Sequence, residues 1–378
     1  MRIGIVTLWN TNNNYGGILQ TYALQRYLRN QGHEAFIIRM LYGNSFFSKI
    51  KKLVKRLLIW LKIIRADYAY RRNCVLNKND NQRLFGHFRD NFISTSRIEY
   101  HHLWMLRLFY PKADCYITGS DQVWGMPLSD PKEAWHYLDF GSRITKRISY
   151  AASFGRDTIQ DSDKDIFIRY ASKLDMISAR EINGVNICKN LGFNAIRCVD
   201  STLLLDAKDY ESLLAKRKHP SSYAYIYSVN MTSASEIYWS TLKHELSNMG
   251  LIPIVTTASG YIAAKEIFDD AEYDYATPHE WLSNIYYSDI VITSSFHGVV
   301  FSILFRKNFI YFPLKSKYKS GNDRVIDLLE LAGLENRTAD SKENAINLLK
   351  SKIDYLQIDA SRLHKLIDQS KDFLGSLK

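Results

Sequence analysis

The sequence has few cysteines and no cysteine motif. Its four cysteines form no C-x-x-C pair and have no histidine at the spacing of a zinc ligand; they are Cys74, Cys115, Cys188 and Cys198. Their spacing excludes a disulfide framework and a cysteine–histidine zinc site. We therefore expect reduced, mostly buried thiols in a cytosolic protein.

Long apolar runs are also missing. The N-terminus, MRIGIVTLWN, has neither the basic start nor the apolar core of a signal peptide. No stretch reaches the roughly 18 uninterrupted apolar residues that a membrane span needs. These absences predict a chain that stays in the cytoplasm.

Nucleotide-binding motifs are absent as well. The chain has no Walker loop and no G-x-G-x-x-G, so nothing indicates a nucleotide cofactor. The D-x-D spacing of Asp161 and Asp163 fits the solvated first turn of a helix better than a metal site. The net charge is +11, yet no nucleic-acid-binding module is recognisable. We expect no cofactor, no metal and no nucleic-acid partner.

The composition and the pattern of predicted elements indicate a globular α/β protein. With 378 residues, 46% of them hydrophobic and 24% charged, the chain is long enough for two domains. Strand and helix patterns alternate in both halves, which predicts two doubly wound, Rossmann-like domains that face a cleft. The expected parts are an N-terminal domain at 1–214, a linker at 215–222, a C-terminal domain at 223–340 and a helical tail at 341–378.

One segment supplies most of the excess positive charge. Residues 49–72 contain nine Lys or Arg against the single acid Asp67. Apolar residues recur there every three or four positions, which predicts an amphipathic helix with a basic face over 49–66. This helix either lies on an anionic membrane, with Trp60 buried in the interface, or packs on its domain with the basic face in solvent.

The most informative stretch is 289–312, DIVITSSFHGVVFSILFRKNFIYF. It predicts a strand at Ile290–Ile292, a buried helix at Val299–Phe305 and a strand at Phe309–Phe312. Between the first strand and the helix, Ser295, His297 and Gly298 lie where open α/β sheets bind ligands and where free backbone N–H groups favour anions. The alternative is that Ser295 only caps the helix and His297 is a core histidine.

Polar residues also follow other predicted strands. They place amides, hydroxyls, carboxylates and a guanidinium at one edge of a parallel sheet, an arrangement typical of an anion-binding site. These residues are Asn14, Gly16 and Gly17, then Ser120 and Asp121, then Ser153, Arg180 and Glu181, and finally Asp200, Ser201 and Thr202. As alternatives, Asp121 caps a turn, Glu181 begins a helix, and Arg324 pairs with Asp323 or Asp327 on an exposed helix.

Together these segments resemble the polysaccharide pyruvyl transferase family from about Met1 to the region of Arg324. The resemblance is carried by NNNYGGILQTYALQRYL, GSDQVW, SYAASFG, SAREING, VDSTLLLD and TSSFHGVVFSILFRKNF. It implies a fold like that of GT-B glycosyltransferases. It also implies transfer of the enolpyruvyl moiety of phosphoenolpyruvate onto a sugar, with formation of a cyclic pyruvate ketal and loss of phosphate. Many members have Asn-x-Gly-Asp and Arg-Leu-His where this chain has Asn-Tyr-Gly-Gly and Ser-Phe-His.

The chemistry of that reaction suggests roles for the residues. His297 would shuttle protons, while Asp121 and Glu181 would bind or deprotonate the sugar hydroxyls. Arg180, Arg324 and the helix opening at Gly298 would hold the anionic donor, with the other strand-end residues lining the site.

The resemblance makes a lipid-linked oligosaccharide at the inner face of the membrane a plausible acceptor. Two other functions stay open. One is a GT-B glycosyltransferase that uses a nucleotide sugar, and the other is a non-catalytic protein of a carbohydrate or lipid surface.

Overall fold

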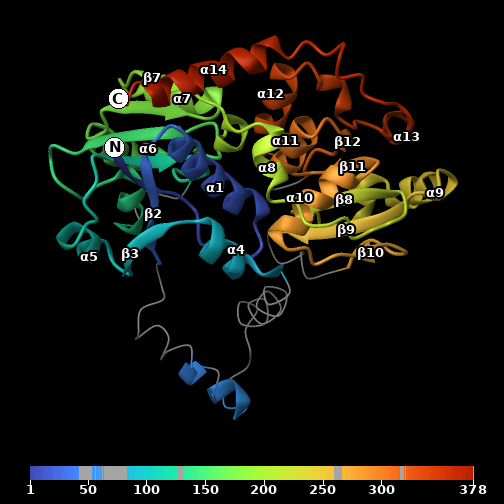
Figure 1. Cartoon of the computed structure of the whole chain (residues 1–378), viewed down its shortest axis with the longest axis horizontal. Coiled ribbons are helices and arrows are strands. Elements are labelled where there is room, and N and C mark those ends of the chain that lie inside the picture. Colours follow the sequence, from blue (N-terminus) through green and yellow to red (C-terminus); the bar gives the residue numbers. More distant parts are fainter. Residues whose placement is uncertain are drawn as a thin grey trace. The chain divides into compact units, whose positions relative to one another are not determined.

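The chain forms two compact α/β units (Figure 1). The computed structural model describes residues 1–41, 53–55, 57–61, 63, 83–125, 131–258, 266–315, 319 and 321–377. Unit 1 consists of Met1–Asn10, Leu24–Asn79 and His87–Arg197, and unit 2 of Thr11–Ala23, Asp80–Gly86 and Cys198–Lys378.

Unit 1 is built on a seven-stranded sheet in which every described strand pair is parallel. The sheet order is β3 (Thr95–Tyr100), β2 (Glu34–Met40), β1 (Arg2–Val6), β4 (Cys115–Gly119), β5 (Lys146–Ala152), β6 (Met176–Ala179) and β7 (Ala195–Arg197). The accompanying helices are α4 (Phe85–Phe92), α5 (Leu103–Leu108), η1 (Pro131–Tyr137), α6 (Asp161–Ala171) and α7 (Ile182–Asn190). The helix α1 (Tyr15–Asn30) begins in unit 2 and ends in unit 1, and so does α4, whose first two residues belong to unit 2.

Unit 2 contains a five-stranded parallel sheet. Its order is β10 (Glu272–Tyr273), β9 (Ile252–Ala258), β8 (Tyr223–Val229), β11 (Ile290–Thr293) and β12 (Asn308–Tyr311). Its helices are η2 (Ser201–Leu204), α8 (Ala207–Glu211), η3 (Ala234–Ile237), α9 (Trp239–Asn248), α10 (Pro278–Tyr287), α11 (Phe296–Leu304), α12 (Asp323–Leu331), η6 (Glu335–Arg337), α13 (Lys342–Lys350) and α14 (Ser361–Gly375).

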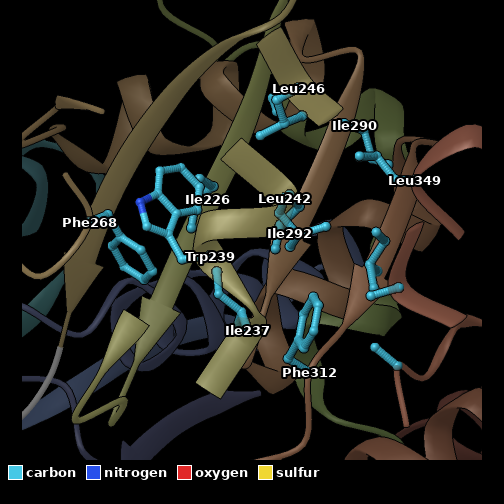
Figure 2. Close-up of a cluster of buried hydrophobic side chains, with 14 of the residues drawn as sticks. Ile226, Ile237, Trp239, Leu242, Leu246, Phe268, Ile290, Ile292, Phe312 and Leu349 are labelled. Carbon is cyan, nitrogen blue, oxygen red and sulfur yellow. The ribbon is translucent and has the colours of Figure 1, made fainter. Parts of the chain in front are cut away.

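The apolar strands of unit 2 pack against α9 and α13 on one face of the sheet. Figure 2 shows Ile226 of β8 and Ile292 of β11 beneath Trp239, Leu242 and other side chains of α9. These residues are almost fully buried, and each such side chain contributes about 1.5–3 kcal/mol to folding. This packing fixes the strand ends that carry the candidate site.

Local sequence signals explain where the helices near the site begin. Thr277 and Glu280 form a capping box at the start of α10, and Pro278 occupies its first turn. The predicted strand, helix and strand of 289–312 are present as β11, α11 and β12. The helix begins three residues before the predicted start, at Phe296, because Ser295 caps it.

The compact units divide the chain differently from the expected boundaries at 1–214 and 223–340. The first loop belongs to unit 2 because the ring of Tyr15 stacks on Trp281, with 5.4 Å between the ring centroids, and its hydroxyl donates to the Ala276 carbonyl at 2.5 Å. The expected linker is also attached to unit 2, since Lys218 pairs with Asp274 at 2.7 Å. The tail is helical, as expected, and forms α13 and α14.

Three of the four cysteines are free and buried, as the spacing predicted: Cys115, Cys188 and Cys198. Burial raises the pKa of both Cys115 and Cys188 to about 12, so these thiols are inert at neutral pH. The fourth cysteine, Cys74, lies outside the described residues. In the part of the chain that the structure describes, every helix is too short or too polar to cross a membrane.

Candidate active site

The junction between β11 and α11 is held by short polar side chains. Thr293 Oγ1 accepts a hydrogen bond from the Ser295 backbone N–H at 3.1 Å and donates to the Tyr227 carbonyl at 2.9 Å. Ser295 Oγ accepts from the Gly298 N–H at 3.4 Å and so caps α11. A Cβ on Gly298 would lie 2.3 Å from Thr293 Oγ1, so a glycine is needed for α11 to pack this closely. Ser295 and Gly298 therefore build the turn that presents His297.

His297 lies in the first turn of α11 and is 8% exposed. Its Nε2 is 3.7 Å from Oδ1 of Asp200, a distance for an ion pair when the imidazole is protonated. Asp200 Oδ1 in turn accepts hydrogen bonds from the backbone N–H and the hydroxyl of Thr202, at 3.0 and 2.7 Å. The carboxylate is fully buried and held in place by these bonds, and His297 Nε2 faces it without a hydrogen bond among the described residues.

The opposite nitrogen of His297 faces the start of α1. A Cβ on Gly16 would lie 1.9 Å from His297 Nδ1, so only glycine leaves room for the imidazole. Asn14 Oδ1 accepts a hydrogen bond from the Gly17 N–H at 2.9 Å and caps α1 at this point. The structure thus brings Gly16 next to His297, with Asn14 and Gly17 in the same turn.

A positive charge lies close to this group. The guanidinium carbon of Arg324 in α12 lies 5.7 Å from the ring centroid of Phe296, the residue before His297. Cation–π contacts of this kind orient an arginine. Arg324 is therefore placed near the helix N-terminus that was expected to bind an anion.

A second group of predicted residues lies at the carboxyl ends of β5 and β6 in unit 1. Ser153 Oγ donates to Glu181 Oε1 at 2.9 Å, and Arg180 Nε donates to the same oxygen at 2.7 Å. Glu181 occupies the N-cap position of α7, but its side chain makes no capping bond. Its carboxylate instead holds Arg180 and Ser153 together.

Asp121 follows β4 in the same sheet, and its two carboxylate oxygens have different surroundings. Oδ1 accepts from the Gln122 N–H at 2.8 Å, which agrees with the turn-capping alternative. Oδ2 is buried and has no hydrogen-bond partner among the described residues. A carboxylate oxygen in this state is costly to leave unpaired, which favours a ligand or water there. The neighbouring Ser120 is buried with a φ of 64°, a strained conformation of the kind found at functional sites.

Asp200 is a residue of the candidate site to which the sequence analysis gave no role. It was recognised as one of the polar residues that follow strands, but nothing in the sequence separated it from an ordinary cap. It is indeed the N-cap of η2. Only the folded chain shows that the same carboxylate faces His297.

A family model for polysaccharide pyruvyl transferase matches residues 14–316. The chain belongs to the polysaccharide pyruvyl transferase family. As a member of this family it is a transferase, and the matched range includes both groups of polar residues except Arg324. No curated protein matches this family member in sequence.

Solved structures share the fold of this pyruvyl transferase family member at low sequence identity. S. aureus MnaA, solved with UDP, has a TM-score of 0.51 and 8% identity over 97% of this chain and 90% of its own. The UDP-GlcNAc 2-epimerase of Neisseria meningitidis has a TM-score of 0.49 and 10% identity over 100% of this chain and 99% of its own. The fold is GT-B, as the resemblance implied.

Metal-binding residues do not gather in the described part of this family member. Within it, no group of three or more His, Cys, Asp and Glu side chains is arranged to hold a metal ion. Asp161 and Asp163 lie in the first turn of α6, where Asp161 pairs with Lys164 at 2.7 Å.

Proposed function

We propose that this protein transfers the enolpyruvyl group of phosphoenolpyruvate onto two hydroxyls of a sugar in a polysaccharide repeat unit, forming a pyruvate ketal and releasing phosphate. The observation that carries the proposal is the buried imidazole of His297, which lies between Asp200 and Gly16 at the start of α11. Family membership supports the reaction class.

The reaction requires two protons to move. Each sugar oxygen forms a bond to C2 of the donor and loses its proton, while the bond between C2 and the phosphate oxygen breaks. One proton is added to C3, which becomes the methyl group, and the other leaves with phosphate. An imidazole that accepts a proton from a hydroxyl and donates it to C3 serves both needs.

His297 has the environment for this role. Asp200 faces Nε2 at 3.7 Å, and we assign the exchange of protons with the substrate to the other nitrogen, Nδ1. When the ring is protonated, the buried carboxylate stabilises the imidazolium by ion pairing. Asp200 would therefore act as a positioning residue, and His297 as the general acid and base.

The donor carries a carboxylate and a phosphate, so it needs several fixed positive groups. Arg324 and the N-terminus of α11 supply them in unit 2. In unit 1, Arg180, which is oriented by Glu181, would contact the donor through its guanidinium. Asp121 and Glu181 would bind or deprotonate sugar hydroxyls, with Ser120 and Ser153 beside them.

The acceptor we propose is a lipid-linked oligosaccharide at the cytoplasmic face of a membrane. The segment 49–66 supports this, because the described residues Leu53, Leu57 and Trp60 are each more than half exposed. Exposed apolar residues beside basic ones suit an anionic interface better than a packed helix. Lys51, Lys52 and Arg56, which would add charge to this contact, lie outside the described residues.

A nucleotide-sugar glycosyltransferase is the competing function, favoured by the GT-B fold alone. The two reactions release different products. Pyruvyl transfer liberates phosphate from phosphoenolpyruvate, whereas glycosyl transfer liberates a nucleotide. Measuring both products in the same incubation separates them.

The experiment is to incubate the pure protein with phosphoenolpyruvate and a panel of lipid-linked and nucleotide-linked sugars, and to detect added pyruvate by mass spectrometry. His297→Ala should lower the rate by about two to four orders of magnitude without unfolding the protein, since that is the usual cost of losing a general acid or base. Asp200→Asn should lower kcat, because the imidazole loses the buried carboxylate that faces it.

Two outcomes would contradict these assignments. A near-normal rate for folded His297→Ala would exclude the proton-transfer role. A His297→Ala protein that does not fold would instead support the core-histidine alternative. Circular dichroism of each variant separates the two results.

A further inference from the structure

A basic pocket lies at the amino-terminal edge of the sheet in unit 1, at the opposite end of the strands from Asp121 and Glu181. Its volume is about 550 Å³. Four of its lining side chains are cationic: Arg107 at the end of α5, Arg143 and Arg147 around the start of β5, and Lys173 before β6. Asp139 is the only acid among the residues that line it.

Arg147 forms a fixed cation in this pocket. Its guanidinium donates four hydrogen bonds to backbone carbonyls, at 3.0 Å to Leu138, 2.8 Å to Thr145, 2.7 Å to Phe140 and 2.9 Å to Ser142. Carbonyl oxygens orient the guanidinium but do not cancel its charge, and no carboxylate of the described residues pairs with it. One of its five N–H groups remains for another acceptor.

The remaining charges leave a positive excess. Asp139 accepts hydrogen bonds from both Arg107 and Lys173, so one carboxylate holds two cations in position. Arg143 is exposed and makes no ion pair within the described part of the chain. Four cations against one anion favour the binding of a further anionic group, such as a phosphate.

Exposed apolar residues lie close in the chain to two of these cations, Arg107 and Arg143. The inner face of α5 buries Leu106 in the core, while its outer face presents Trp104 and Leu108 beside Arg107. Trp104, Leu108 and the following Phe109 are each more than half exposed, and Ile144, next to Arg143, is 95% exposed. A surface helix normally turns polar residues outward, so an outer face of Trp and Leu needs a partner.

We propose that this edge of unit 1 docks on an anionic phospholipid bilayer, with a headgroup phosphate in the basic pocket and the side chains of Trp104, Leu108, Phe109 and Ile144 in the interface. Aromatic and aliphatic residues beside cations are the combination that binds such interfaces. A second copy of the chain would bring like charges together, and a free phosphate would leave the apolar side chains in water. The site is distinct from segment 49–66 and does not depend on pyruvyl transfer.

The test measures sedimentation with vesicles of phosphatidylcholine alone and of phosphatidylcholine mixed with phosphatidylglycerol. Full-length protein carrying Leu53→Ser, Leu57→Ser and Trp60→Ser serves as the background, so that binding through the other segment is removed. We expect this background to bind the anionic vesicles, to bind the neutral ones at least tenfold more weakly, and to lose binding as salt is raised.

Added to that background, Arg143→Glu should weaken binding to anionic vesicles about tenfold or more, because it reverses one charge at the surface. Trp104→Ser with Leu108→Ser should weaken it similarly. Lys365→Glu is the matched control, since Lys365 is an exposed lysine of α14 in unit 2, and it should have no comparable effect. Pyruvyl transfer to a water-soluble acceptor should stay normal in all of them, so failure here leaves the proposed reaction intact.

Three results would overturn the proposal. The first is equal binding to both kinds of vesicle, or equal effects of Arg143→Glu and the control. The second is tight binding of inorganic diphosphate in the pocket, measured by calorimetry, with no vesicle binding. The third is a concentration-dependent dimer in sedimentation velocity that Trp104→Ser with Leu108→Ser dissolves, which would identify the surface as a contact between two copies.

Discussion

The imidazole of His297 fills the space that a side chain on residue 16 would need. A methyl group on residue 16 would lie 1.9 Å from His297 Nδ1, too close for any real contact. The start of α1 is fixed by Tyr15, so the imidazole has to move instead. The distance between His297 and Asp200 then changes, which affects the chemistry before it affects the fold.

Gly16→Ala should therefore lower kcat by at least tenfold, because small displacements of a catalytic group are costly. Gly375→Ala is the control: no heavy atom lies within 4 Å of its added methyl group, and alanine within a helix is worth about 0.5–1 kcal/mol over glycine. Steady-state rates and melting temperatures of both variants check this. Full activity in Gly16→Ala would show that the imidazole does not need its present position.

Residue types and their order pointed to His297 as a candidate site residue, but not to Asp200 as the residue that faces it. His297 was predicted because a strand, a turn and a helix follow one another within a short stretch of sequence. Asp200 contacts it across a large sequence separation, and an N-cap aspartate is common in any protein. Contacts of this kind depend on packing between elements, which a single sequence does not reveal.

At the scale of elements, the ends of β5 and β6 hold Ser153, Arg180 and Glu181 in one hydrogen-bonded group. Arg180→Lys removes the planar guanidinium that contacts Glu181 and that we propose for donor binding. We expect a raised KM for phosphoenolpyruvate and little change in the KM for the acceptor. Initial-rate kinetics with each substrate varied in turn measure this, and an unchanged donor KM would exclude Arg180 from donor binding.

A second element contact joins α5 to the loop before β6 through Asp139. Burial alone would raise the pKa of Asp139, but hydrogen bonds from Lys173 and Arg107 outweigh it and hold that pKa below its usual range. A carboxyl group whose pKa is lower in the folded protein than in the unfolded chain stabilises the folded state at pH values above its pKa in the unfolded chain, about 4. This stabilisation is lost as the pH falls through the pKa that the group has in the folded protein.

Asp139→Asn should therefore destabilise the protein by about 0.5–1 kcal/mol at neutral pH, since the two cations are partly exposed. The difference from wild type should shrink at pH values below about 4. Thermal unfolding across pH measures it, with Asp165→Asn as the control at an exposed aspartate without an ion pair among the described residues. A pH-independent difference would mean that the loss comes from packing and not from charge.

The predicted elements were most accurate where apolar runs were strong. β11, α11 and β12 were all anticipated, because a strand between turn signals and a fully apolar helix leave little ambiguity. β3 and α5 were missed. β3, with the sequence TSRIEY, has one aliphatic residue and lies at the edge of the sheet, and α5 has only six residues with apolar side chains on both faces. Such short elements are set by their neighbours more than by their own pattern.

At the scale of the molecule, the division into units was not evident from composition. The polar segment 215–222 looked like a boundary, yet it is attached to unit 2 by Lys218 and by the bond from Ser283 to the Ala215 carbonyl. The first loop and residues 80–86 belong to unit 2 through ring contacts of Tyr15 with Trp281 and Phe85. The chain passes between the two units several times, and no change in amino-acid composition marks these crossings.

The two edges of the sheet in unit 1 set a requirement for the acceptor. Strand β5 has seven residues and joins the basic pocket at one end to Ser153 at the other, which separates them by roughly 20 Å. If the pocket rests on the bilayer, the sugar that attaches directly to a lipid carrier lies too far below the reactive edge. Pyruvate would then be added late in assembly, to a distal sugar. On vesicles, long lipid-linked oligosaccharides should be modified and their one-sugar precursors spared, whereas in detergent solution this preference for length should disappear.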